Sequence, residues 1–295
     1  MKKIYHIYDK AFKRILTLSG KSVINLINGL FGTDYPTDSK ITYNWTENTD
    51  TELKRTLADS ILTINGRDSY HMEAQMTEDE EIVFRVFEYG YQYAYKNRIV
   101  VSGGERLVFP EARIIYMDEG KKDSIPDEYI LTLDFREQGV FTYKVPVVKL
   151  QNMEAKELND KKLFALLPFL LLKLRKKISQ IRSEENMEEL KNLLLNDIMS
   201  TINRNEEIGN ISISDAIDLK ELTLRLYEEI YAKYSELEGF TMRLFDQSME
   251  LFTDRYDKTV EELQEEMQDI IEKSKAEIEK RDARIRELEE MLSKK

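Results

Sequence analysis

The sequence predicts an α/β domain with a mixed sheet, followed by an all-α half that ends in a coiled coil. All five prolines lie before residue 169, and the 127 residues from there on are rich in Leu, Glu and Lys. Proline disrupts helix interiors, whereas Leu, Glu and Lys favour helices, so this shift marks a change of architecture. Before it, the order helix, three strands, helix, strand is typical of a mixed sheet with helices packed on it.

The elements of the first half follow from apolar periodicity. A helix is expected over about 9–31, eased at Gly20, and a loop rich in Gly, Pro and Asp follows over 32–38. Strands are then expected near 41–45, 57–64, 70–76, 112–117, 129–135 and 141–150, with a helix near 79–98.

Three polar residues lie within apolar runs of one predicted hairpin. Asp59 lies in the first run, Glu73 and Gln75 lie in the second, and Asn65–Asp68 forms a strong turn signal between them. Alternation along a strand puts Glu73 and Gln75 on one face. A carboxylate in a half-buried strand is costly unless it is compensated, and two of them on facing strands repel. A metal ion is the obvious compensating group.

The metal hypothesis depends on the register of this hairpin. Asp59 lies opposite Glu73 only if Ile64 pairs with Asp68 across a three-residue loop. A two-residue loop would place Asp59 opposite Ala74 and separate the acids, so the hypothesis requires the first register or a bulge.

The spacing of these residues suits metal-dependent phosphodiester hydrolysis. Asp59, Glu73 and the backbone carbonyl of Ala74 would give Mg²⁺ (or Mn²⁺) hard oxygen ligands, and Gln75 would point at the attacking water. The alternative is that all three side chains are polar positions on the solvated face of an antiparallel hairpin.

Composition limits the classes of function. The 295 residues contain no Cys, which excludes disulfides, thiolate catalysis and zinc–sulfur sites. Only two His occur, His6 and His71, which leaves little room for a histidine-based triad or zinc site. His71 is expected to point to the face opposite Glu73 and receives no catalytic role. No stretch approaches the roughly 20 apolar residues of a membrane span, and no signal-peptide core is present. We therefore expect a soluble cytoplasmic protein.

The net charge of −12 argues against nucleic-acid binding through bulk charge. Residues 1–150 carry 20 basic and 23 acidic side chains, whereas residues 151–295 carry 24 and 33. Most of the acidity therefore lies in the second half. The charge count does not exclude a local basic groove in the first half.

The second half reads as helices over about 155–180, 184–203, 213–236 and 240–292. In the last helix, seven of ten heptad a and d positions are apolar; the ten are Val260, Gln264, Met267, Ile271, Ser274, Ile278, Arg281, Ile285, Leu288 and Leu292. This spacing predicts a coiled coil, against the alternative of a single charged helix in solvent. We divide the chain into a first domain (1–150), a helical domain (151–238) and the long helix (239–295).

Several motifs, in order, resemble one known family. Residues Tyr8–Leu16 contain the Asp-x-x-Phe-Lys pattern that opens the PD-(D/E)XK nuclease family transposases, the recombination-promoting nuclease (Rpn) group. The similarity continues through Asp59, Met72–Gln75, Arg85–Tyr89 and Leu166–Phe169, and covers roughly residues 5–175.

The resemblance implies a restriction-endonuclease-like core and metal-dependent DNA cleavage. Asp59 and Glu73 become metal ligands, and Gln75 takes the place of the signature Lys of the wider superfamily. An amide orients water or contacts phosphate but cannot stabilise charge as an ammonium does. Asp9 is expected at the start of the first helix, where it caps the helix or contacts the site. Tyr8 replaces the His found in many relatives.

The roles of two basic residues, Lys13 and Arg85, can each be interpreted in two ways. Lys13 and Arg85 would hold substrate phosphate, or would pair with acids such as Asp9. Arg85 lies among apolar residues, so we expect partial burial and a site carboxylate as its partner. The tyrosine-rich stretch 89–95 is expected to pack in the core or along a helix face rather than stack on bases.

The leading hypothesis is an Mg²⁺-dependent DNA endonuclease that forms a homodimer through its coiled coil, because a two-fold dimer suits cutting of both DNA strands. Its alternative is a catalytically inactive protein of nuclease fold that acts through the coiled coil. A mobile-element transposase would share the chemistry of the first.

Overall fold

The computed structural model describes residues 2–44, 61–118, 125–244 and 268. The chain divides into two compact units, residues 1–237 and 238–295. The predicted boundary between residues 150 and 151 falls inside the first unit. Among the described residues, no helix combines the length and the apolar character that crossing a membrane requires.

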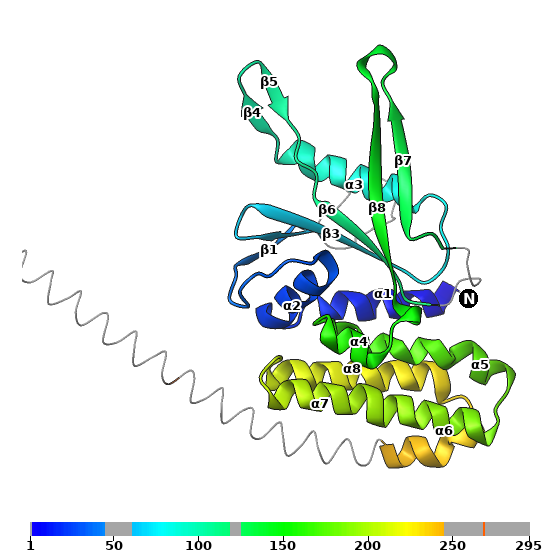
Figure 1. Ribbon diagram of the computed structural model, residues 1–295. Helices are drawn as coiled ribbons and strands as arrows, with labels where there is room; N and C mark the ends of the chain where they lie inside the picture. Colours follow the sequence, from blue (N-terminus) through cyan, green and yellow to red (C-terminus); the bar gives the residue numbers. More distant parts are fainter. Residues whose placement is uncertain (1, 45–60, 119–124, 245–267, 269–295) are drawn as a thin grey trace, which may run out of the picture. The chain divides into compact units, whose positions relative to one another are not determined.

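A six-stranded mixed sheet forms the centre of the first unit (Figure 1). Its strands are β1 (Ile41–Asn44), β2 (Ile61–Ile64), β3 (Asp68–Gln75), β6 (Glu111–Tyr116), β7 (Glu128–Asp134) and β8 (Val140–Lys149). They lie in the order β1-β2-β3-β6-β8-β7. The central strands β3, β6 and β8 are parallel, and the others are antiparallel to their neighbours. The predicted mixed sheet is therefore confirmed.

The turn between β2 and β3 fixes the register of this pair. Asn65 and Gly66 have φ values of 53° and 69°, a left-handed conformation that Asn and Gly adopt most readily. Arg67 N–H donates to the carbonyl of Ile64 at 3.1 Å. Ile64 pairs with Asp68, which is the register that the metal hypothesis requires.

The sheet has a helix on each face (Figure 1). Helix α3 (Ile82–Lys96) covers one face, where its apolar side chains pack with those of β6, β7 and β8; the buried members are Ile82, Val83, Val86, Ala112, Ile114, Tyr116, Leu131 and Val145. On the other face Phe31 packs against Tyr70 of β3, with ring centroids 4.5 Å apart. Odd-numbered residues of β3 therefore point towards α3.

The N-terminal region forms two helices, α1 (Lys2–Ile15) and α2 (Gly20–Phe31), so the single predicted helix over 9–31 is wrong. Ser19 explains the break, which falls next to the expected easing at Gly20. Its backbone leaves the helical region (φ −54°, ψ 154°), and its Oγ accepts a hydrogen bond from Ser22 N–H at 3.4 Å.

A buried carboxylate joins the start of α2 to helix α8 (Ile213–Tyr231). Asp215 is 2% exposed. It accepts hydrogen bonds from Ser19 N–H at 2.8 Å, from Ser22 Oγ at 2.6 Å, and from Ser19 Oγ. Because these donors come from a region 196 residues earlier in the chain, Asp215 ties the N-terminal helices to the helical region.

Replacing Asp215 with Ala is expected to lower the free energy of unfolding by about 2 kcal/mol, because buried hydroxyl and amide donors lose their acceptor. Urea denaturation followed by circular dichroism measures this loss in the free energy of unfolding. Asp218→Ala is the matched control on the same helix: Asp218 pairs with the exposed Arg14, so a change within about 0.5 kcal/mol is expected. Equal loss in both variants would contradict the anchoring role.

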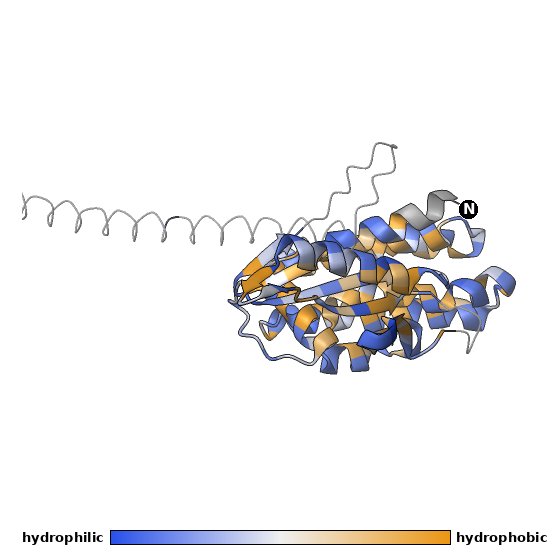
Figure 2. Ribbon diagram, turned by 90° about the horizontal axis from the view of Figure 1, so that it is seen from above, coloured by the Kyte–Doolittle hydropathy of each residue, from blue (hydrophilic) through white to orange (hydrophobic). Residues whose placement is uncertain are grey.

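The helical region follows β8 and contains α4 (Ala155–Asp160), α5 (Arg175–Gln180), α6 (Glu184–Asn192), α7 (Ser200–Glu207) and α8, with short 3₁₀ segments at 150–152 and 235–237. The predicted helix over 155–180 is divided by a 3₁₀ segment, Phe164–Leu174, which contains Pro168. A π-helical segment, Leu193–Met199, joins α6 to α7. Polar and apolar residues both occur along the strands and helices of this unit (Figure 2). The ten predicted a and d positions lie outside the described residues.

Two β-hairpins project from the first unit (Figure 1). The sequence did not predict the first, β4 (Ile99–Val101) with β5 (Gly104–Arg106), whose six residues are exposed. The second hairpin consists of β7 and the part of β8 before residue 147. This part of β8 pairs with β7 alone, because β6 pairs with β8 only from residue 147 onward. Exposed apolar side chains such as Val100 and Phe141 lie on these hairpins.

Candidate functional site

Strand β3 and helix α3 bring Glu73 and Arg85 together. The Glu73 side chain is 3% exposed and lies on the sheet face that α3 covers. Arg85, in the first turn of α3, donates to Glu73 Oε1 through Nε at 3.0 Å and contacts it through Nη2 at 2.9 Å. Gln75 Nε2 donates to the same oxygen at 3.2 Å. At Oε1, the buried carboxylate therefore has a cation and hydrogen-bond donors.

Arg85 also binds a second carboxylate. Its Nη1 lies 2.9 Å from Asp79 Oδ2, so one guanidinium bridges two acids. Burial alone would lower the pKa of Arg85, but the carboxylates of Glu73 and Asp79 outweigh that effect and raise it. Arg85 was expected either to hold substrate phosphate or to pair with a site carboxylate, and its contacts are those of the second role. Sequence reasoning missed Asp79, for which the only signal was an acidic run at 78–81.

Replacing Arg85 with Lys is expected to lower the free energy of unfolding by about 1.5 kcal/mol, because an ammonium keeps the charge but loses the fork that serves two carboxylates. Thermal or urea unfolding measures this loss. Arg14→Lys is the control, since Arg14 pairs with one carboxylate, Asp218, at an exposed position. An Arg85→Lys protein as stable as the wild type would show that the bridge is dispensable.

His71 lies beside Glu73, and the expectation that it faces the opposite side of the sheet is wrong. Residues two apart on a strand share a face, and His71 Nε2 lies 3.8 Å from Glu73 Oε2. The imidazole is fully buried, and neither ring nitrogen has a hydrogen-bond partner among the described residues. Burial, reinforced by the charge of Arg85, lowers the pKa of His71 to about 4, so its ring is neutral at pH 7.

The proposed metal ligands are only partly within the described residues. Glu73 is buried on β3, and Ala74 lies next to it, opposite Ile115 of β6. Asp59 lies outside the described residues, so its place opposite Glu73 stays a prediction. Within residues 2–44, 61–118, 125–244 and 268, no three His, Cys, Asp or Glu side chains gather closely enough to hold a metal.

Asp9 lies in the middle of α1, so the expectation that it caps the start of that helix is wrong. The helix begins seven residues earlier, at Lys2, because the helical pattern extends back to the N-terminus. Asp9 Oδ2 accepts a hydrogen bond from Lys13 Nζ at 3.0 Å, one turn later. A contact between either residue and substrate stays a prediction.

The tyrosines of α3 divide between core and surface. Tyr89 is buried, and Tyr93 hydroxyl is hydrogen-bonded to Thr63 and Ser69 of the hairpin. Tyr91 and Tyr95 are 45% and 52% exposed, and their rings stack with centroids 6.2 Å apart. The core and helix-face interpretation therefore holds for the stretch, with one exposed aromatic pair.

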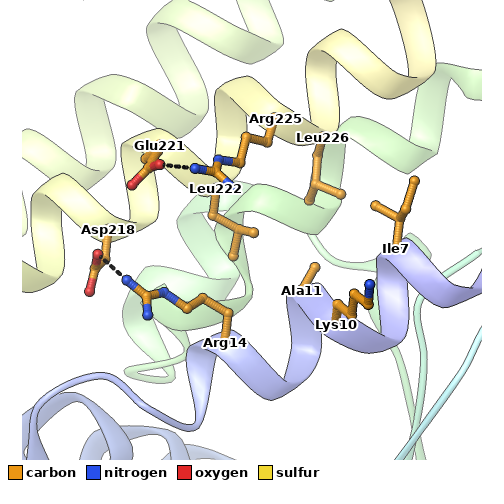
Figure 3. A pocket seen from close by; sticks show the side chains of 9 residues that line it. All are labelled: Ile7, Lys10, Ala11, Arg14, Asp218, Glu221, Leu222, Arg225 and Leu226. Atoms are coloured by element: carbon orange, nitrogen blue, oxygen red, sulfur yellow. Dashed lines mark hydrogen bonds and ion pairs between the residues drawn. The ribbon is translucent and has the colours of Figure 1, made fainter.

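A separate hollow of about 490 Å³ lies between α1 and α8 (Figure 3). Arg14 and Arg225 reach into it, but Asp218 and Glu221 pair with them. Its other lining residues are Ile7, Lys10, Ala11, Leu222 and Leu226. Both arginines are therefore paired with acids of α8.

The Glu73 cluster, defined as His71, Glu73, Gln75, Asp79 and Arg85, gathers an imidazole, an amide, a cation and two acids at one place on the sheet. Function is inferred from these side chains and from the fold that holds them. No protein-family model matches the chain, and the comparisons found no curated protein and no solved structure similar to it.

Proposed function

We propose that the chain is a metal-dependent DNA endonuclease with a restriction-endonuclease-like core, as its resemblance to the Rpn transposase family implies. The observation that carries the proposal is the buried Glu73 carboxylate with Gln75 beside it, on a hairpin whose register is set by the pairing of Ile64 with Asp68. A buried acid of this kind suits a cation ligand better than a solvated position on a hairpin.

The topology supports the same proposal. Two helices, three antiparallel strands, helix α3, the β4–β5 hairpin and then the parallel strand β6 follow one another from α1 to β6. Apart from the divided first helix and the added hairpin, the sequence predicted this order, and Glu73 lies at the carboxyl end of a central parallel strand. Ligand sites of open sheets with parallel strands gather at such ends.

The residues fit a hard cation such as Mg²⁺ (or Mn²⁺). Asp59, Glu73 and the Ala74 carbonyl would hold it through oxygen atoms, as such cations prefer. When bound, the cation would generate hydroxide from water and neutralise charge on the phosphoryl group. Arg85 holds Oε1 of Glu73 and thereby orients the carboxylate.

Gln75 and the cations have distinct roles in this proposal. Gln75 donates to Glu73 Oε1 and would orient water or contact a phosphate oxygen with its amide. Arg85 positions Glu73 and does not reach phosphate while it bridges two acids. Lys13 would contact the phosphate backbone, and Asp9 would support it through their ion pair.

Plasmid nicking in the presence of Mg²⁺ or Mn²⁺ tests the proposal. Wild-type protein should convert supercoiled plasmid to open circles, EDTA should stop the reaction, and Asp59→Ala should remove it. Equal nicking by the wild type and the variant would count against the proposal. No nicking and no binding of divalent metal at millimolar concentration would favour the inactive, coiled-coil interaction protein instead.

The same proposal includes a homodimer formed by the C-terminal heptads, with DNA as the partner of the first unit. Light scattering on the full chain should give twice the chain mass of 34.9 kDa. Replacing Ile278 and Ile285, both at predicted a positions, with Asp should give a monomer. A wild-type monomer would remove the dimer from the proposal and leave the chemistry untouched.

A further inference from the structure

His71 belongs to the Glu73 cluster, and both of its ring nitrogens lack hydrogen bonds among the described residues. Its side chain is fully buried, and Nδ1 and Nε2 both lack a partner there. Leaving a buried polar group unpaired costs about 1–3 kcal/mol. A neutral imidazole has one donor and one acceptor nitrogen, so the acceptor needs either a hydrogen-bond donor or a metal ion.

The neighbouring carboxylate turns its second oxygen towards the imidazole. Arg85 and Gln75 both contact Oε1 of Glu73, which leaves Oε2 on the side of the imidazole. His71 Nε2 and Glu73 Oε2 are 3.8 Å apart. Metal–nitrogen and metal–oxygen bonds are each about 2.1 Å long, so one cation can reach both atoms when their separation is below about 4.2 Å.

We propose that His71 Nε2 and Glu73 Oε2 are two adjacent ligands of one divalent transition-metal ion. The inference deepens the proposed function and rests on it only for the presence of a cation at Glu73. It identifies the class of metal: an imidazole ligand favours Zn²⁺, Fe²⁺ or a similar ion, whereas sites made of oxygen alone favour Mg²⁺.

Two further residues of the cluster hold the carboxylate of this pair. Within the described residues, no third His, Cys, Asp or Glu side chain joins His71 and Glu73. Arg85 and Gln75 act here as positioning residues, because they hold the carboxylate through its other oxygen.

Nitrogen NMR of the full chain, labelled with ¹⁵N only in histidine, tests the proposal without a mutation at the site. The chain has two histidines, and His6→Gln assigns the signals that remain to His71. Addition of Zn²⁺ should shift the coordinated ring nitrogen of His71 much further than addition of Mg²⁺ does, because only Zn²⁺ would bond to that nitrogen. A His71 ring that is unmoved at saturating Zn²⁺ overturns the proposal.

A second measurement compares metal affinities by equilibrium dialysis. His71→Gln should lower the affinity for Zn²⁺ by at least about tenfold, more than the affinity for Mg²⁺, because the lost ligand is a nitrogen. His6→Gln is the matched control and should leave both affinities unchanged. Equal losses for the two metals, or no loss for either, would overturn the proposal.

The two proposals fail in different ways. If Asp59 controls Mg²⁺-dependent nicking while His71 never responds to Zn²⁺, the nuclease stands and the nitrogen ligand is overturned. If the wild type does not nick plasmid but a Zn²⁺-induced shift of His71 is seen and is lost in Glu73→Gln, the metal site stands and the nuclease is overturned.

Discussion

Replacing Glu73 with Gln is expected to lower the rate of metal-dependent plasmid nicking by at least about 100-fold. Removing groups that merely support a metal ligand already costs about 10- to 100-fold, and Glu73 would be a ligand itself. The amide keeps the shape of the side chain but loses the negative charge that a divalent cation requires. Initial rates with Mg²⁺ and with Mn²⁺ measure the effect.

The control for this variant lies on the helix that covers the site. Glu88 is exposed on α3. Among the described residues, its side chain has one hydrogen-bond partner, Gln92, whose Nε2 donates to Glu88 Oε1 at 3.3 Å. Glu88→Gln should therefore nick plasmid at the wild-type rate. Arg85 keeps Asp79 as a partner in Glu73→Gln, so the circular dichroism spectrum should stay that of a folded protein. A folded Glu73→Gln protein with wild-type activity would refute the role of this carboxylate.

Replacing Gly29 with Ala is expected to lower the free energy of unfolding by about 3 kcal/mol. Alanine in a helix is ordinarily about 1 kcal/mol better than glycine. At Gly29, however, a Cβ atom would lie 2.1 Å from the carbonyl oxygen of Lys161 and 2.7 Å from Leu163 Cδ2. Because a backbone carbonyl cannot move aside cheaply, the clash outweighs the gain in helix propensity.

Gly20, in the same helix, serves as the matched control. A Cβ atom there would meet only Ile41 Cδ1, at 3.9 Å, which is an ordinary contact. Gly20→Ala should therefore leave the stability unchanged or raise it by up to about 1 kcal/mol. Urea denaturation of both variants gives the comparison. If Gly29→Ala is the more stable of the two, the close approach of α2 to residues 161–163 is refuted.

The hairpin of the candidate site could be predicted because its determinants are local. Asn65 and Gly66 adopt left-handed backbone conformations that few other residues tolerate, and they fix the pairing of Ile64 with Asp68. The shared face of Glu73 and Gln75 then follows from the alternation of side chains along a strand. The same rule, applied correctly, would also have placed His71 beside Glu73.

Other parts could not be predicted because they depend on tertiary packing or on where a helix begins. The break between α1 and α2 depends on Ser19, whose partner Asp215 belongs to a helix near the other end of the first unit. The pairing of Arg85 with Asp79 depends on where α3 starts and how it packs on the sheet. Asp9 was misplaced because the helix extends further back than its apolar pattern suggested.

The link between Ser19 and Asp215 has a consequence during synthesis of the protein. The ribosome makes the N-terminal helices first, but their anchor is 196 residues further along the chain. At about 5 to 20 residues per second, that delay is about 10 to 40 s. Throughout this interval the nascent chain lacks Asp215, so its hydrogen bonds with Ser19 and Ser22 form only after α8 has left the exit tunnel.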